Sequence, residues 1–159
     1  MKVIFLDIDG VLNSMDHLDS LMKIKPYKKK LEQFDEITHE KFGEKFDFRC
    51  CNWLEYIIGA TKAKIVISSS WKEIGIVGLK EMWIKRALPG EILDITKELK
   101  SSRGQEIDNW VIENNPSSYV IIDDTADFFL HQNKNLILTN SKFGLTRELS
   151  DLAIKILGT

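Results

Sequence analysis

Short apolar segments alternate with segments of helical periodicity along this chain, and that alternation restricts its fold more than any other feature. The apolar segments are rich in β-branched residues, and apolar side chains fill most positions instead of alternating with polar ones. This pattern is typical of strands that are buried on both faces of a parallel sheet. The predicted strands are residues 3–6, 63–67, 91–95, 119–122 and 136–138. Strands that alternate with helices predict an α/β fold in which a parallel sheet is covered by helices.

The segments between the predicted strands carry apolar residues at helical spacing. Helices are predicted over residues 48–60, 76–87, 104–114 and 146–157, with Asp47 and Thr146 as N-caps of the first and the last. The pattern weakens over residues 14–46, which we interpret as a small insertion after the first strand that carries one or two short helices. We expect the rest of residues 1–159 to form a single domain around it.

Composition and charge argue against several classes of protein. The 43% hydrophobic and 29% charged residues are typical of a soluble globular protein, and a net charge of −2 offers no overall basic field for nucleic acid or membrane. No apolar run approaches membrane-spanning length, and the N-terminal run is too short for a signal peptide. The adjacent Cys50 and Cys51 are expected to be small core residues in a reducing compartment. We therefore expect a cytoplasmic protein with no membrane partner, and no pattern in the sequence indicates an oligomeric state.

Polar residues follow three of the predicted strands directly. Asp7 and Asp9 follow the first strand, Ser68 follows the second, and Asp123 with Asp124 follows the strand over 119–122. In an open parallel sheet, ligands bind beyond the carboxyl ends of the strands. The sequence therefore predicts that these residues meet at one site.

The residue types at this site indicate phosphoryl chemistry. Clustered carboxylates raise each other's pKa unless a cation joins them, and no His or Cys cluster is nearby, so a hard cation such as Mg²⁺ is expected. An aspartate can attack phosphorus to form an aspartyl-phosphate. In extended backbone, Asp7 and Asp9 point to the same side, so Asp9 can act as acid and base, while Gly10 lets the chain turn away. The Ser68 hydroxyl and loop N–H groups would bind the phosphoryl oxygens.

These motifs, in this order, resemble the haloacid dehalogenase superfamily. The dehalogenase branch lacks an acid/base aspartate at the position of Asp9, so the resemblance implies a phosphatase or phosphotransferase. Segments 65–72, 103–107 and 144–146 resemble more closely the small branch linked to RNA-repair proteins and polynucleotide phosphatases. The implied architecture is a three-layer, Rossmann-like parallel sheet flanked by helices.

The resemblance also implies roles for individual residues. Asp7 would be the nucleophile and a Mg²⁺ ligand, and Asp9 the acid/base residue, with its backbone carbonyl on the metal. Asp124 would bind the metal directly, and Asp123 would act through water or on the surroundings of the nucleophile. The phosphoryl group would be bound by Ser68, Ser69 and a basic residue. Arg103 is the first choice for that residue, with Lys100 and Lys97 as alternatives.

The function predicted from the sequence is thus Mg²⁺-dependent phosphomonoester hydrolysis. A phospho-accepting signalling receiver is the first alternative, but a receiver carries its acidic pair before its phosphorylated aspartate, in the opposite order. The second is a phosphate-binding module without turnover, which the presence of both Asp7 and Asp9 argues against. The short insertion predicts an open site. Such a site could admit a nucleic-acid 3′ end, whereas a nucleotide or small phosphorylated molecule is the simpler substrate. Lysines near residues 23–30 and Trp71 could help to bind nucleic acid, although solvated lysines and a packed Trp71 are favoured.

Overall fold

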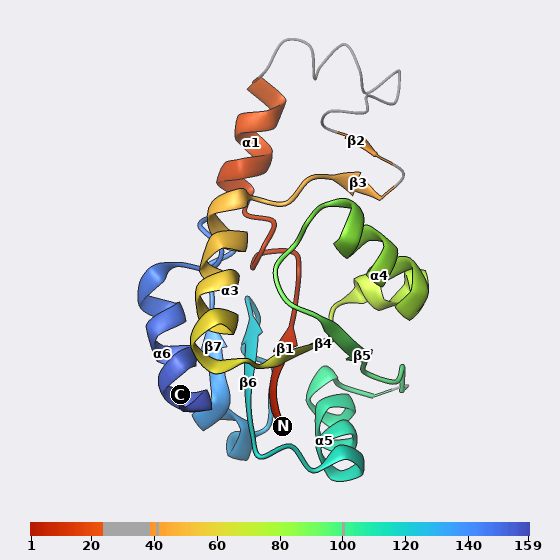
Figure 1. The fold of residues 1–159 in the computed structure, drawn as a ribbon, viewed down its shortest axis with the longest axis vertical. Helices are drawn as coiled ribbons and strands as arrows, with labels where there is room; N and C mark the ends of the chain where they lie inside the picture. Colours follow the sequence, from red (N-terminus) through yellow and green to blue (C-terminus); the bar gives the residue numbers. More distant parts are fainter. Residues whose placement is uncertain (24–38, 41, 100) are drawn as a thin grey trace.

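The computed structural model describes residues 1–23, 39–40, 42–99 and 101–159, and a five-stranded sheet forms its centre (Figure 1). The strand order is β5-β4-β1-β6-β7, and every neighbouring pair is parallel. The strands are β1 (Lys2–Leu6), β4 (Lys64–Ile67), β5 (Ile92–Ile95), β6 (Ser118–Asp123) and β7 (Leu136–Leu138). This parallel sheet between helices confirms the predicted α/β, three-layer, Rossmann-like fold class.

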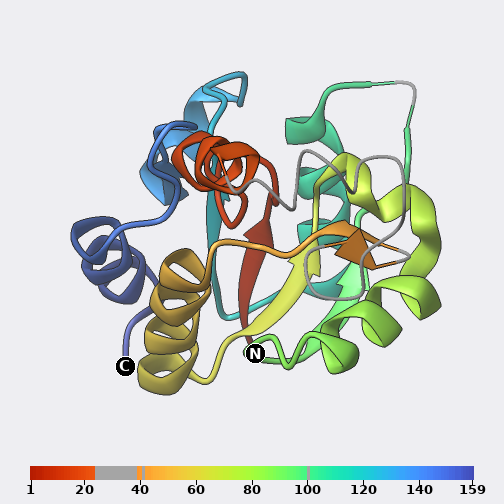
Figure 2. The same cartoon turned by 90° about the horizontal axis from the view of Figure 1, so that it is seen from above.

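Helices cover both faces of the sheet, as the view from above shows (Figure 2). Ile4 and Leu6 of β1 belong to a core cluster with residues of three helices, whereas Val3 and Phe5 belong to a second cluster with residues of α5. Alternate side chains of β1 thus reach different layers, which explains why the strand is apolar at every position. The helices are α3 (Phe48–Thr61), α4 (Gly75–Lys85), α5 (Arg103–Asn114) and α6 (Arg147–Leu157). Two short 3₁₀ helices, η1 (Ser70–Ile74) and η2 (Leu130–Asn135), follow β4 and β6.

The insertion after β1 differs in part from the prediction. It contains one described helix, α1 (Met15–Lys23), followed by a two-stranded antiparallel sheet of β2 (His39–Glu40) and β3 (Gly43–Glu44). These strands were not predicted, because two residues are too few to show an alternating pattern. Residues 24–38, which hold most of the lysines named above, lie outside the described residues.

Asp47 joins the two ends of the insertion to the domain. Its carboxylate caps α3 by accepting a hydrogen bond from the backbone N–H of Arg49 at 2.9 Å, as the sequence predicted, and another from the Ser14 hydroxyl at 2.9 Å. Burial would raise the pKa of Asp47, but the hydrogen bonds from Arg49 and Ser14 outweigh it and lower that pKa below its ordinary value. Because Ser14 precedes α1 and Asp47 follows β3, this buried contact closes the base of the insertion.

Cys50 and Cys51 are buried and unpaired, which confirms their expected place in the core. Burial raises the pKa of the Cys50 thiol to about 11 and that of the Cys51 thiol to about 12. Both thiols are therefore protonated near neutral pH, so neither is an activated nucleophile.

Candidate active site

The carboxyl ends of the three central strands place the predicted residues side by side. Leu6 at the end of β1 pairs with Ile67 of β4 on one side and with Ile122 of β6 on the other. The residues that come next are Asp7, Ser68 and Asp123. The backbone ladder continues through them, since the N–H of Asp7 donates to Ile122 at 3.0 Å and that of Ser68 donates to Leu6 at 3.1 Å. The parallel register thus brings together residues from three distant parts of the chain.

Asp7, Asp123 and Asp124 form a compact group of carboxylates. One oxygen of each lies within 4.8 Å of the others, and Asp123 is fully buried. Burial raises the pKa of Asp7, and the nearby charge of Asp123 acts in the same direction. Burial followed by the charge of Asp123 also raises the pKa of Asp124. The negative charges therefore repel one another, and a cation bound by these oxygens would relieve that repulsion.

Arg103 provides a positive charge to this group. It is the first residue of α5, whose N-cap Ser102 accepts a hydrogen bond from the N–H of Gln105. One guanidinium nitrogen lies 3.2 Å from a carboxylate oxygen of Asp7 and also forms an ion pair with Asp123. One guanidinium cannot balance three carboxylates. An oxygen-only donor set with net negative charge suits a hard divalent cation such as Mg²⁺.

The two alternatives to Arg103 are placed differently. The ammonium of Lys97 lies 2.7 Å from each carboxylate oxygen of Glu113 of α5, in an exposed ion pair. Lys100 lies outside the described residues. Of the candidate basic residues that the structure describes, Arg103 is therefore the one that contacts Asp7.

The Ser68 hydroxyl is buried and has no hydrogen-bond partner among the described residues. An unsatisfied buried hydroxyl destabilises the folded state by about 1–3 kcal/mol. A ligand that accepts its hydrogen bond would explain why such a hydroxyl stands at the end of a central strand. The neighbouring Ser69 acts on Asp7, since its hydrogen bond opposes the rise in the pKa of Asp7 that burial causes. A phosphoryl oxygen accepting a hydrogen bond from Ser68 would satisfy that hydroxyl.

Asp9 is exposed, and its carboxylate is outside the three-carboxylate group. Two side chains orient it: the Asn13 amide donates to one carboxylate oxygen at 3.2 Å, and the Trp71 indole N–H donates to the other at 2.9 Å. The Trp71 ring packs edge-to-face on Phe46, with ring centroids 5.4 Å apart. Packing of Trp71 was expected from the sequence, but its hydrogen bond to Asp9 was missed. The available signal was that an indole N–H usually finds a partner.

A cavity of about 410 Å³ opens at this end of the sheet. Asp7, Asp9, Arg103 and Asp124 line it, and Met15 and Leu18 of α1 line it on the side of the insertion. The cavity thus gives a ligand access to the carboxylates and the guanidinium at once. These groups can position a nucleophile, an acid/base group and a cation around an anionic substrate.

Among known proteins, the chain matches the model of one family, described as the HAD domain in Swiss Army Knife RNA repair proteins, over residues 3–149. HAD stands for haloacid dehalogenase. The matched range contains every site residue described above. No curated protein and no solved structure is similar enough to the chain to count as a match. Within the described residues, every helix is too short or too polar to cross a membrane.

Proposed function

The chain belongs to the family of HAD domains in Swiss Army Knife RNA repair proteins and hence to the HAD-type phosphohydrolases, and from this premise we propose that it is a Mg²⁺-dependent phosphomonoester hydrolase with Asp7 as nucleophile. One arrangement carries the proposal. The Arg103 guanidinium contacts the carboxylates of both Asp7 and Asp123, and Asp124 completes the carboxylate group. The unpartnered Ser68 hydroxyl follows the adjacent strand. The proposed nucleophile, its countercharge and the proposed donor to a phosphoryl oxygen therefore follow the carboxyl ends of neighbouring strands.

The proposed reaction has two steps. A carboxylate oxygen of Asp7 attacks phosphorus, and the bond to the leaving oxygen breaks as Asp9 gives that oxygen a proton. The product is an aspartyl-phosphate on Asp7. Asp9 then takes a proton from a water that attacks the same phosphorus, which releases inorganic phosphate and restores Asp7. Ser68 donates to a phosphoryl oxygen, and Arg103 offsets negative charge on Asp7 and on the substrate.

The carboxylates of Asp7 and Asp124, with the backbone carbonyl of Asp9, are the proposed Mg²⁺ ligands. Asp123 would act through water or on the surroundings of the nucleophile. When bound, Mg²⁺ offsets negative charge, so that an aspartate can approach an anionic phosphate. The close spacing of the Asp7, Asp123 and Asp124 oxygens supports this assignment.

For the substrate we propose a nucleotide or a nucleic-acid end. The family description refers to RNA repair. On the side of the insertion, the cavity over Asp7 is lined by helix α1, and the described residues contain no large cap domain. A terminal phosphate on a long strand can enter a site of this kind. The cytoplasmic location expected from the sequence stays a prediction.

A phosphate-release screen tests the proposed function. We expect release from p-nitrophenyl phosphate and from 3′-phosphorylated oligonucleotides in Mg²⁺, loss of release in excess EDTA, and recovery when Mg²⁺ is restored. Mononucleotides in the same screen compare small substrates with strand ends. Phosphate that stays bound to the protein without turnover would instead indicate a signalling receiver. Binding of phosphate without any covalent step would indicate a non-catalytic module.

Trp71→Phe tests the role of Asp9, because it removes the indole N–H and keeps an aromatic ring against Phe46. We expect kcat to fall about tenfold for phosphate esters of alcohols, which are poor leaving groups, since acid catalysis contributes about 10²–10⁴-fold in total. The fall should be smaller for p-nitrophenyl phosphate, whose leaving group needs little protonation. Trp83→Phe is the matched control, because the Trp83 indole donates to the Pro89 carbonyl at 2.9 Å instead. Equal slowing of both substrate types would contradict a positioning role.

A further inference from the structure

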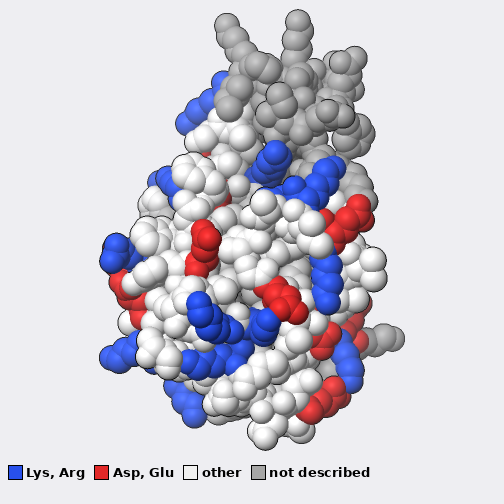
Figure 3. Space-filling view, viewed as in Figure 1, with Lys and Arg blue, Asp and Glu red and all other residues white. Residues whose placement is uncertain are grey.

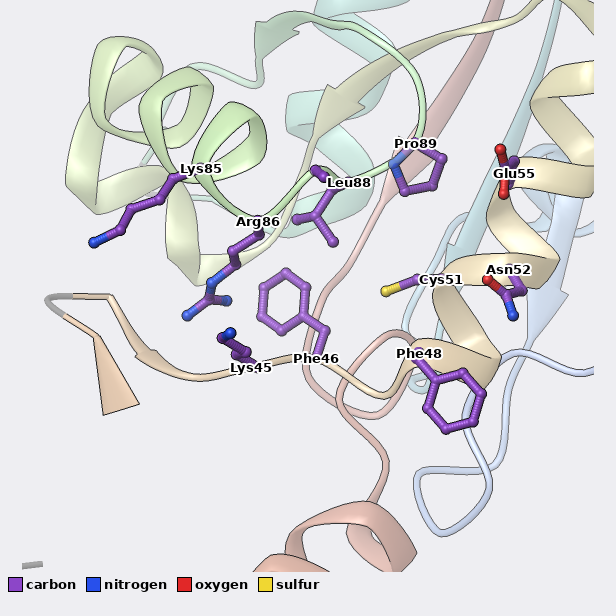
Figure 4. A pocket seen from close by; sticks show the side chains of 11 residues that line it. Lys45, Phe46, Phe48, Cys51, Asn52, Glu55, Lys85, Arg86, Leu88 and Pro89 are labelled. Atoms are coloured by element: carbon purple, nitrogen blue, oxygen red, sulfur yellow. The ribbon is translucent and has the colours of Figure 1, made fainter. Parts of the chain in front are cut away.

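A second cavity, of about 370 Å³, lies where the end of the insertion meets α3 and α4 (Figure 4). Its walls come from Lys45 and Phe46 after β3, from the first turns of α3, and from the segment that ends α4. The close-up shows the Phe46 ring between Arg86 and the α3 side of the cavity, with Leu88 and Pro89 across from it. This arrangement combines an apolar floor with basic groups.

The chemistry of this cavity suits a base attached to a phosphate backbone. Phe48, the first residue of α3, is 70% exposed and leaves an aromatic face open at the rim. The basic residues Lys45, Lys85 and Arg86 line the cavity together with the carboxylate Glu55. Aromatic side chains beside basic ones are the usual elements of single-strand binding sites, because rings stack on bases and cations attract phosphates.

The basic wall of the cavity has a defined position. The Arg86 guanidinium lies over the Phe46 ring, 4.6 Å from its centroid, and donates a hydrogen bond to the Gly43 carbonyl at 3.1 Å. Figure 3 shows that the face seen in Figure 1 carries both basic and acidic side chains. The Arg86 side chain at this cavity is therefore held in place by a ring contact and a hydrogen bond.

One aromatic contact and one hydrogen bond connect this cavity with the active site. Phe46 lines the cavity, packs against the Trp71 ring, and Trp71 in turn donates its N–H to Asp9. Resting on the proposed function, we propose that this second cavity binds a nucleotide unit of a single-stranded nucleic acid whose terminal phosphate lies at Asp7. The strand would then pass from Asp7 over the Trp71–Phe46 pair to Phe48 and Lys45.

Two exposed side chains allow the test with little risk to folding, namely Phe48→Ala and Lys45→Ser. Anisotropy of a fluorescein-labelled single-stranded RNA with a 3′-hydroxyl measures strand binding without catalysis. We expect Phe48→Ala to weaken binding about tenfold through lost stacking. Lys45→Ser should reduce the slope of log Kd against log salt by about 0.7, the value for one phosphate contact on a single strand. KM for the 3′-phosphorylated RNA should rise in both variants, while hydrolysis of p-nitrophenyl phosphate stays unchanged.

Matched controls come from remote surfaces: Ile112→Ala, 78% exposed on α5, and Lys155→Ser, exposed on α6. If the wild type does not bind RNA, or if the cavity variants bind it like the controls while p-nitrophenyl phosphate is still hydrolysed, the cavity proposal is overturned and the proposed function stands. If the wild type hydrolyses no substrate, but the two cavity variants bind RNA more weakly than the wild type and the controls, the cavity proposal is supported and the proposed function fails. DNA of the same sequence, run in parallel, shows whether the sugar contributes.

Discussion

Asp7→Asn is expected to lower kcat for phosphomonoester hydrolysis by at least about 10⁴-fold, because a carboxamide is a far weaker nucleophile than a carboxylate. The exchange keeps the size of the side chain, and the Asp123 ion pair remains to hold Arg103. Phosphate release measures the rate. Acid quenching during turnover of a ³²P-labelled substrate should trap label on the wild-type protein and none on the variant.

The stability of the same variant separates lost chemistry from lost structure. Burial and the charge of Asp123 raise the pKa of Asp7, so the folded chain disfavours the ionised carboxylate. The contribution of Asp7 to the free energy of unfolding is therefore lost as pH rises from the unfolded pKa through the folded pKa. Removal of that charge should leave the urea midpoint in EDTA at neutral pH unchanged or higher. Asp151→Asn, on the exposed face of α6, is the control with full activity. Hydrolysis by Asp7→Asn within tenfold of the wild type would exclude Asp7 as the nucleophile.

Gly10→Ala is expected to reduce hydrolysis by about 100-fold or more, since displacement of site groups by about 1 Å has effects of this size. Gly10 has φ +74°, and a Cβ there would lie 2.2 Å from a carboxylate oxygen of Asp124 and 2.8 Å from its Cβ. Asp124 would have to leave the carboxylate group to make room. The Mg²⁺ concentration for half-maximal activity should rise, which a Mg²⁺ titration of the hydrolysis rate measures.

Gly75→Ala is a matched control for the effect of backbone strain. Gly75 has φ +75°, but a Cβ at that position meets nothing within 4 Å. Both variants should lose about 1–3 kcal/mol of unfolding free energy, because each forces an alanine to a positive φ that L-residues rarely adopt. Only Gly10→Ala adds the collision with Asp124, so only it should alter the Mg²⁺ dependence. Equal Mg²⁺ titrations for the two variants would show that Asp124 has no part in metal binding.

Most of the fold could be predicted because its signals are local. A strand buried on both faces is apolar at each position, and the helices between the strands show their caps at Asp47 and Thr146. The elements that were missed have no such local signal. The strands β2 and β3 have two residues each, and the 3₁₀ helix η1 covers one short turn after Ser69, so neither creates a periodic pattern.

By itself, the sequence determined the fold class and the candidate residues at the strand ends, because apolar segments reveal where strands stop and parallel strands stop at a common edge. It placed Asp7, Ser68 and Asp123 together for that reason alone. Tertiary structure decided what surrounds them: Arg103, not Lys97, contacts Asp7, and Trp71 contacts Asp9. These contacts join residues far apart in the chain, and they depend on how helices and loops pack on the sheet. Sequence periodicity describes each element separately and contains no measure of that packing.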